Sequence, residues 1–180
     1  MPTGGSTIQF KHMTAEIELD LSELRAVTAY AVACAEPVLS IFEQARPDDR
    51  RPREAIEAAR AFAEGAKRGK AIRDAAWAAQ RAYQEARDAG QAAASEAARA
   101  AVAAAGAAYL HPLAKATQVW HILGPAGHAA HACELAGRNP RLPAAGPVVA
   151  QVLSRYPPAP GGRGRAGELV RELDALLRKG

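Results

Sequence analysis

Apolar residues recur at every third or fourth position along most of the chain, which is the spacing of one buried face on an α-helix. The clearest stripes lie within residues 21–38, 56–66, 70–89 and 167–179. Glycine and proline separate these segments, and no solid strand pattern stands out between them. The pattern predicts an all-α protein, a single compact domain of about seven or eight close-packed, alanine-rich helices.

Some helix ends follow from local chemistry. Asp20 and Glu23 have the spacing of a capping box, which predicts that the first helix begins after Asp20, and a start after Ser22 is the alternative. Pro37 predicts a break or kink, because its ring removes one backbone bond and clashes with the preceding turn. A Gly-Pro step at positions 124 and 125 likewise predicts two separate helices, over residues 112–123 and 125–136.

Residues 1–13 lack any helical period and contain the pair His12-Met13, which is often left at a cloning junction. We expect either a flexible N-terminal segment or a cloning remnant, with an alternative start or a short strand over Thr7–Phe10 equally open. The helical domain is expected to span residues 14–180.

Alanine makes up 46 of the 180 residues, and its small side chain lets helix axes approach closely. With 49% hydrophobic residues the chain is too apolar to be disordered. No apolar run reaches the roughly 18–20 residues of a membrane span, so no membrane partner is expected. The two cysteines cannot form a disulfide framework, which predicts a cytoplasmic protein.

Charge is distributed unevenly along the sequence. Residues 14–49 carry a net charge of −6, residues 50–137 carry +4, and residues 138–180 carry +5. This asymmetry predicts a polarised surface that could steer a charged partner, although the charges could equally just solvate helix faces. Only 5% of residues are aromatic and no nucleic-acid motif is present, which argues against nucleic acid as a partner.

Four of the five histidines lie between positions 111 and 131. Histidine is the usual acid, base or metal ligand near neutral pH, so this clustering marks a candidate site. His121 and His128 are two helical turns apart, about 10 Å, which is too far for one metal ion. His128, His131 and Glu134 could share a face, but they lack a recognised zinc signature. We expect neither a metal nor a cofactor.

A catalytic set is one interpretation of the remaining polar residues. His111, His121 and Lys115 lie close in sequence, and Asp74 could orient a histidine from the neighbouring helix. The alternative is a structural network between helices, in which these groups satisfy one another.

Trp77 lies on the flank of its helix, with Arg73 and Arg81 one turn away on either side. The arrangement is typical of a tryptophan at the edge of the core with arginines over its ring, and a ligand platform stays open.

A run of specific residues interrupts the alanine background near the N-terminus. It consists of Cys34-Ala35-Glu36-Pro37-Val38-Leu39, Phe42-Glu43, Pro47-Asp48-Asp49, Arg51-Pro52-Arg53, Ala55-Ile56-Glu57-Ala58 and Ala61-Phe62-Ala63. With His111 and the step His121-Ile122-Leu123-Gly124, these residues resemble the bacterial immunity proteins of polymorphic toxin systems. The resemblance covers roughly residues 20–136. The tail at Tyr156–Pro160 looks like an actinobacterial extension of that family.

The resemblance implies a protein that neutralises a cognate toxin by protein–protein contact, through either the acidic 14–49 segment or the basic 138–180 end. Aromatic and arginine side chains are the usual anchors of such an interface. The candidates are Trp77, Trp120, Arg51, Arg53, Arg73, Arg81 and His128. The family often has a histidine at the positions of Gln80 and Thr117, so a histidine-dependent activity common to the family would be altered here.

Two other classes stay open. One is a small helical enzyme, cyclase- or lyase-like, or a protein that binds a small-molecule ligand of a specialised metabolic pathway. It requires that Asp74, Trp77, His111, Lys115 and His121 converge on one interhelical pocket. The other is a scaffold or homo-oligomeric module, which requires an exposed alanine face over residues 91–108.

Overall fold

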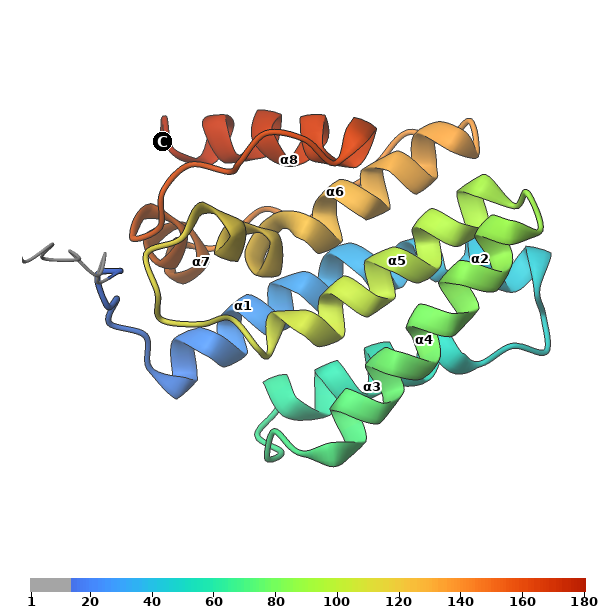
Figure 1. The fold of residues 1–180 in the computed structure, drawn as a ribbon, viewed down its shortest axis with the longest axis horizontal. Helices are drawn as coiled ribbons and strands as arrows, with labels where there is room; N and C mark the ends of the chain where they lie inside the picture. Colours follow the sequence, from blue (N-terminus) through green and yellow to red (C-terminus); the bar gives the residue numbers. More distant parts are fainter. Residues whose placement is uncertain (1–13) are drawn as a thin grey trace, which may run out of the picture.

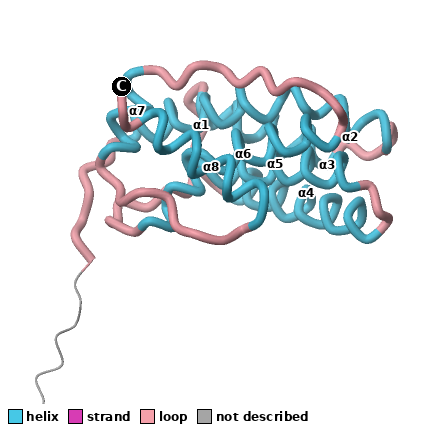
Figure 2. Tube along the Cα trace, turned by 90° about the horizontal axis from the view of Figure 1, so that it is seen from above, coloured by secondary structure: helices cyan, strands magenta, loops and turns pink. Residues whose placement is uncertain are grey.

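A computed structural model describes residues 14–180 of the chain. The described part consists of helices and loops (Figure 2), and the predicted all-α fold is confirmed. Within it the only bridge of β type joins Glu16 to Leu113. The expectations for residues 1–13, including the strand over Thr7–Phe10, lie outside the described residues. The α-helices are α1 (Leu21–Ala35), α2 (Leu39–Ala45), α3 (Arg51–Ala63), α4 (Lys70–Asp88), α5 (Ala92–Ala107), α6 (Val119–Leu135), α7 (Pro147–Ser154) and α8 (Gly164–Leu177).

Helix α5 lies at the centre of the structure. It packs against α1, α2, α3, α4 and α6, and Figure 1 shows α3 and α4 on one side of it and α6 with α8 on the other. Nine of its sixteen residues are buried, eight of them alanines. Small side chains allow this many neighbours to approach one helix. The exposed alanine face that a scaffold module requires is therefore absent from α5.

The first helix begins as predicted. The Asp20 carboxylate accepts from the Glu23 amide at 2.8 Å, and the Glu23 side chain accepts from the Asp20 amide at 3.1 Å. At Pro37 the chain tightens into a 3-10 turn (Glu36–Val38) and continues directly as α2. Counted as one helix, Leu21–Ala45 is long and apolar enough to cross a membrane, which the search for apolar runs missed. Its most apolar window is 61% buried, as in the core helix of a folded domain.

The predicted interruption at Gly124-Pro125 is wrong. Helix α6 runs unbroken from Val119 to Leu135 with Pro125 inside it. The proline cannot donate to the carbonyl of His121, a loss that disfavours a helix. Burial of thirteen of the seventeen residues of α6 outweighs this cost through tertiary packing.

The boundaries around α6 and α8 also differ from expectation. Residues 112–115 are not helical, and a 3-10 turn (Ala116–Gln118) leads into α6. Helix α8 begins at Gly164 rather than Gly167, because Arg163 adopts a left-handed conformation with φ 61° that turns the chain into the helix.

The charges of the sequence segments pair with one another in space. The N-terminal segment supplies the acids of four ion pairs: Glu23–Arg155, Glu36–Arg60, Glu43–Arg53 and Asp49–Arg51. The asymmetry along the sequence therefore acts largely within the fold.

Candidate functional site

Two adjoining hollows lie between α4, α5, α6 and the start of α8, with volumes of about 410 and 400 Å³. Both are lined by Arg99, His128 and Arg163. We call the two together the arginine groove. Its walls also include Gln80, Tyr83, Glu96, Thr117, Gln118, Trp120, His121 and His131.

The floor of the arginine groove is the incompletely buried face of α5. Glu96, Arg99, Ala103 and Gly106 are half-buried, whereas the alanines between them are covered by neighbouring helices. Their spacing of three and four residues places them on one side of the helix. The helix that forms the centre of the fold thus also forms the base of the groove.

Arg99 and Arg163 each lie over an aromatic ring. The Arg99 guanidinium carbon is 4.6 Å from the centre of the Tyr83 ring, and that of Arg163 is 4.3 Å from the Trp120 ring. Neither has a carboxylate within 4.0 Å among residues 14–180. Glu96 and Arg99, three residues apart on α5, do not form an ion pair, because the Glu96 carboxylate faces α6.

The Glu96 carboxylate binds two histidines of α6. It accepts a hydrogen bond from Nδ1 of His128 at 2.8 Å, and Nδ1 of His131 lies 3.4 Å from the same oxygen without a hydrogen bond. Burial raises the pKa of Glu96, but the hydrogen bond from His128 and electrostatic attraction to the rings of His128 and His131 lower it by more, so it stays ionised. Burial lowers the pKa of His128 despite this partner, which keeps its ring neutral.

His121 lies on the same helix, nearer the other end of the arginine groove. Its Nδ1 is 2.8 Å from the carbonyl of Gly106, which fixes the proton on Nδ1 because the carbonyl can only accept. Burial lowers the pKa of this ring, and the charges of His111 and Arg163 add to the effect. Its Nε2 is therefore an acceptor at neutral pH.

These depressed pKa values predict a loss of stability on mild acidification. Unfolded histidines take up protons near pH 6.5, whereas His121 and His128 resist protonation in the folded state. The unfolded state then binds more protons, so the free energy of unfolding is expected to fall as the pH drops below about 6.5. Urea unfolding at a series of pH values between 7.5 and 5.5 measures this slope.

Single variants identify the residues that cause the pH dependence of the free energy of unfolding. His121→Asn and His128→Asn should each flatten it, while Lys115→Gln, at an exposed position, should leave it unchanged. An equal slope in all four proteins would contradict the assignment.

The groups expected to form a catalytic set do not converge. Asp74 is exposed and pairs with Lys70, and Trp77 is 62% exposed on the outer face of α4. Lys115 is exposed, and His111 is exposed with its backbone amide bonded to the Gln118 side chain at 2.9 Å. Of the five residues proposed for one pocket, only His121 lines the arginine groove.

Arg51 and Arg53 have partners within the chain. Arg51 lies between Asp49 and Glu85, with contacts of 2.7 and 2.6 Å, and so connects α3 to α4. Arg53 donates to Glu43 on α2 at 2.9 Å. The two arginines of the Arg-Pro-Arg motif therefore connect α3 to α4 and to α2 through ion pairs.

The other candidates separate into two places. Trp120 is 7% exposed and lies under Arg163, and His128 is buried, so both belong to the arginine groove. Arg73 and Arg81 are exposed on either side of Trp77. Neither arginine lies over the Trp77 ring, in contrast to the expected packing at a core edge.

The described residues contain no group of three or more His, Cys, Asp or Glu side chains that could hold a metal ion. In particular, Glu134 does not join His128 and His131. It pairs instead with Arg165 of α8 at 2.7 Å.

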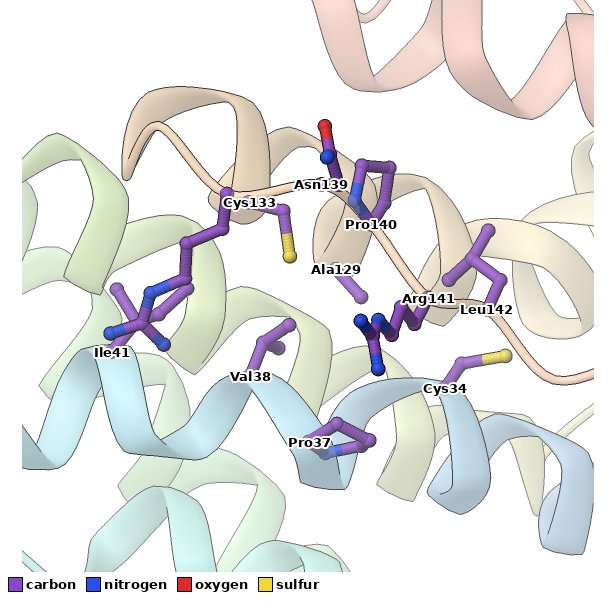
Figure 3. A pocket seen from close by; sticks show the side chains of 11 residues that line it. Cys34, Pro37, Val38, Ile41, Ala129, Cys133, Asn139, Pro140, Arg141 and Leu142 are labelled. Atoms are coloured by element: carbon purple, nitrogen blue, oxygen red, sulfur yellow. The ribbon is translucent and has the colours of Figure 1, made fainter.

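A separate apolar hollow of about 170 Å³ lies between α1, the 3-10 turn Glu36–Val38, α2 and α6, under the loop that follows α6. Figure 3 shows Cys133 on α6 above it and Cys34 on α1 below. Both thiols are free and buried. Burial raises the pKa of Cys34 to about 12 and also raises that of Cys133.

These thiols are therefore expected to be inert, since the thiolate is the reactive form. At pH 8 an aromatic disulfide reagent should label the native protein at least about 100-fold more slowly than the unfolded protein. The release of the coloured thiol, followed with and without guanidinium chloride, gives the comparison. Fast labelling of two thiols in the native state would contradict their burial.

The profile of the Imm-5 like putative immunity protein family matches residues 18–139, more than half of the chain. The chain belongs to this family. No curated protein sequence matches it, and neither does any solved structure. The Imm-5 like region contains α1 to α6 and agrees with the resemblance seen over residues 20–136. Helices α7 and α8 lie beyond it, so Arg163 completes the arginine groove from outside the matched region.

Sequence reasoning missed Glu96, Arg99 and Arg163 as site residues. A signal for the first two exists, because they interrupt an otherwise alanine helix three residues apart. Arg163 offered none, since it lies in a loop whose path only the fold reveals. Gln80 and Thr117 both line the groove.

Proposed function

We propose that this Imm-5 like protein is an immunity protein that neutralises a cognate toxin by binding it through the outer face of α4. The observation that carries the proposal is Trp77, which is 62% exposed on that face. The family supports immunity in general, and the exposed tryptophan supplies the kind of anchor that such binding requires.

Charge surrounds this tryptophan on its own helix. Arg73 and Arg81 lie one turn before and after it, both exposed and without a carboxylate within 4.0 Å among residues 14–180. Tryptophan and arginine are the residues most enriched at energetic centres of interfaces. The face therefore suits a toxin surface that offers an apolar depression between acidic side chains.

The inner side of α4 holds this face rigidly. Ile72, Ala79, Ala82 and Ala86 are buried against α3 and α5, and Arg51 anchors the C-terminal part of the helix through Glu85. Anchors on a rigid element lose little conformational freedom on binding, so more of the contact energy contributes to affinity.

The test uses the toxin-type product of the gene beside this protein's own. Trp77→Ala should weaken binding by about 30-fold or more, as for removal of a central anchor, and should abolish protection of cells that express the toxin. Arg73→Glu should slow association most at low salt, because it reverses charge at the interface. Calorimetry, association kinetics and growth measure these effects.

Leu176→Ala provides a matched control, because Leu176 is a large apolar residue that is 67% exposed on α8. It should leave binding and protection unchanged. Unaltered affinity in Trp77→Ala would exclude this face as the binding surface, and absence of any binding by the unmodified protein would overturn the proposed function.

A further inference from the structure

The arginine groove contains two cations that the fold leaves without acidic partners. Nine other arginines of the described chain form ion pairs with carboxylates. Arg99 and Arg163 form none there, and no hydrogen bond of their guanidinium groups to residues 14–180 is present either. Their contacts are the Tyr83 and Trp120 rings.

This contact leaves the hydrogen-bonding edge of each guanidinium available. Each guanidinium carries five N–H donors, and none of them has an acceptor among residues 14–180. Because both side chains line the same two hollows, these donors can meet a single ligand. The planar fork of arginine matches the paired oxygens of a phosphoryl group.

The loop before α8 holds Arg163 in place. Arg163 itself has a φ of 61°, between Gly162 at 89° and Gly164 at 57°. Arg171 donates to the carbonyl of Gly162 at 2.9 Å, which fastens this turn to α8. A non-glycine residue in the left-handed region is disfavoured, and such conformations persist where the surroundings enforce them.

The electrostatic surroundings favour an anion. The Arg99 charge adds to burial in lowering the pKa of Arg163, so the two guanidinium groups are close enough to repel. Among the described acids, Glu96 lines one of the two hollows, and His128 and His131 occupy its carboxylate. The hollow that contains Gln80, Thr117 and His121 has no acidic residue on its walls.

We propose that the arginine groove binds a small phosphate monoester, with the phosphoryl group held between Arg99 and Arg163. Two fixed positive charges match a phosphoryl dianion better than a single carboxylate. The side chains of Gln80, Thr117 and Gln118, with Nε2 of His121, provide polar partners for the rest of the ligand. A volume of about 410 Å³ is in the range of small-molecule sites. The proposal does not depend on toxin binding, because Trp77 lies outside the groove.

Calorimetric titration of the full chain with ribose 5-phosphate at low ionic strength tests the site, with ribose as the neutral control. Saturable one-to-one binding of ribose 5-phosphate is expected, and none of ribose. Arg99→Gln and Arg163→Gln should each weaken binding by about ten-fold or more, since each removes a charge-assisted pair of hydrogen bonds. Arg163→Lys keeps the positive charge but loses the planar pair of N–H donors. Its affinity is therefore expected to lie between those of the unmodified protein and Arg163→Gln.

Arg141→Gln is the matched control, because it removes the same charge from an exposed position in the loop after α6, outside the groove. It should bind ribose 5-phosphate normally. In a Trp77→Phe background, Trp120 is the only tryptophan, and its fluorescence should change with the same affinity as the heat signal. The fluorescence titration also measures ligand binding by variants whose folded state is less stable.

Three results would overturn the proposal. One is the absence of saturable binding. Another is a heat signal that sodium chloride reproduces at equal ionic strength, which means that the signal comes from general screening of charges and not from binding in the groove. The third is an equal loss of affinity in Arg141→Gln and Arg99→Gln, which means that net charge rather than the groove attracts the ligand.

Discussion

Replacing Asp174 by alanine is expected to lower the free energy of unfolding by about 3–5 kcal/mol, as for a buried ion pair that loses one partner. Asp174 is 3% exposed, and its carboxylate accepts from Arg178 at 2.7 Å and from the Ala159 amide at 2.9 Å. Arg178 also donates to the carbonyl of Tyr156 at 3.0 Å. Without the carboxylate, the Arg178 guanidinium keeps only carbonyl acceptors, the Ala159 amide loses its acceptor, and the 156–160 turn loses part of its attachment to α8.

Urea unfolding followed by circular dichroism measures this loss. Asp174→Asn should cost less, because its amide oxygen can still accept one of the bonds, and it keeps the test possible if the alanine variant does not fold. Asp88→Ala is the control, since Asp88 pairs with Arg87 in solvent, and removal of an exposed pair costs about 1 kcal/mol or less. Equal effects of Asp174→Ala and Asp88→Ala would refute the assignment.

Adding one methyl group at Gly127 is expected to destabilise the protein by about 1–3 kcal/mol. A Cβ at this position would lie 2.5 Å from Cγ2 of Val170 and 3.0 Å from the carbonyl oxygen of Ala166. The side chain could turn away, but the carbonyl belongs to the backbone of α8. Gly127→Ala must therefore push α8 away from α6.

Thermal and urea unfolding of three variants test this packing. Gly146→Ala should change stability little, because nothing lies within 4 Å of a Cβ there. The double variant Gly127→Ala, Val170→Ala should be more stable than the sum of the single effects predicts, since it removes the nearest obstacle. Strict additivity would mean that Val170 and Gly127 do not limit the approach of the helices.

Local signals predicted much of the fold because they act over a few residues. The Asp20–Glu23 box needs only its own turn, and the apolar stripe of α4 needs only the period of one helix. Pro125 misled the prediction because its cost is local, whereas the compensation comes from helices packed around α6. A sequence pattern shows the local cost of a proline, but it does not show the tertiary packing that compensates for this cost.

The candidate site was predictable only in part, for a similar reason. The histidine cluster pointed to α6, and His121 and His128 do line the arginine groove. The other residues of the site depend on how each helix is rotated about its axis and on the path of the loops. The rotation of α4 places Trp77 on the outer face, and the loop before α8 brings Arg163 into the groove. Glu96 could have paired with Arg99 on its own helix, and the neighbouring α6 decided in favour of His128.

The central position of α5 has a consequence for how this protein can change during evolution. A helix whose buried side chains are almost all single methyl groups has no room for a larger residue, so random substitution there should be tolerated least, although the segment looks like the simplest of the chain. The outer face of α4 has no such restriction. A protein built in this way can exchange the residues of the proposed binding face while its alanine centre stays fixed, which suits the proposed role of a toxin inhibitor.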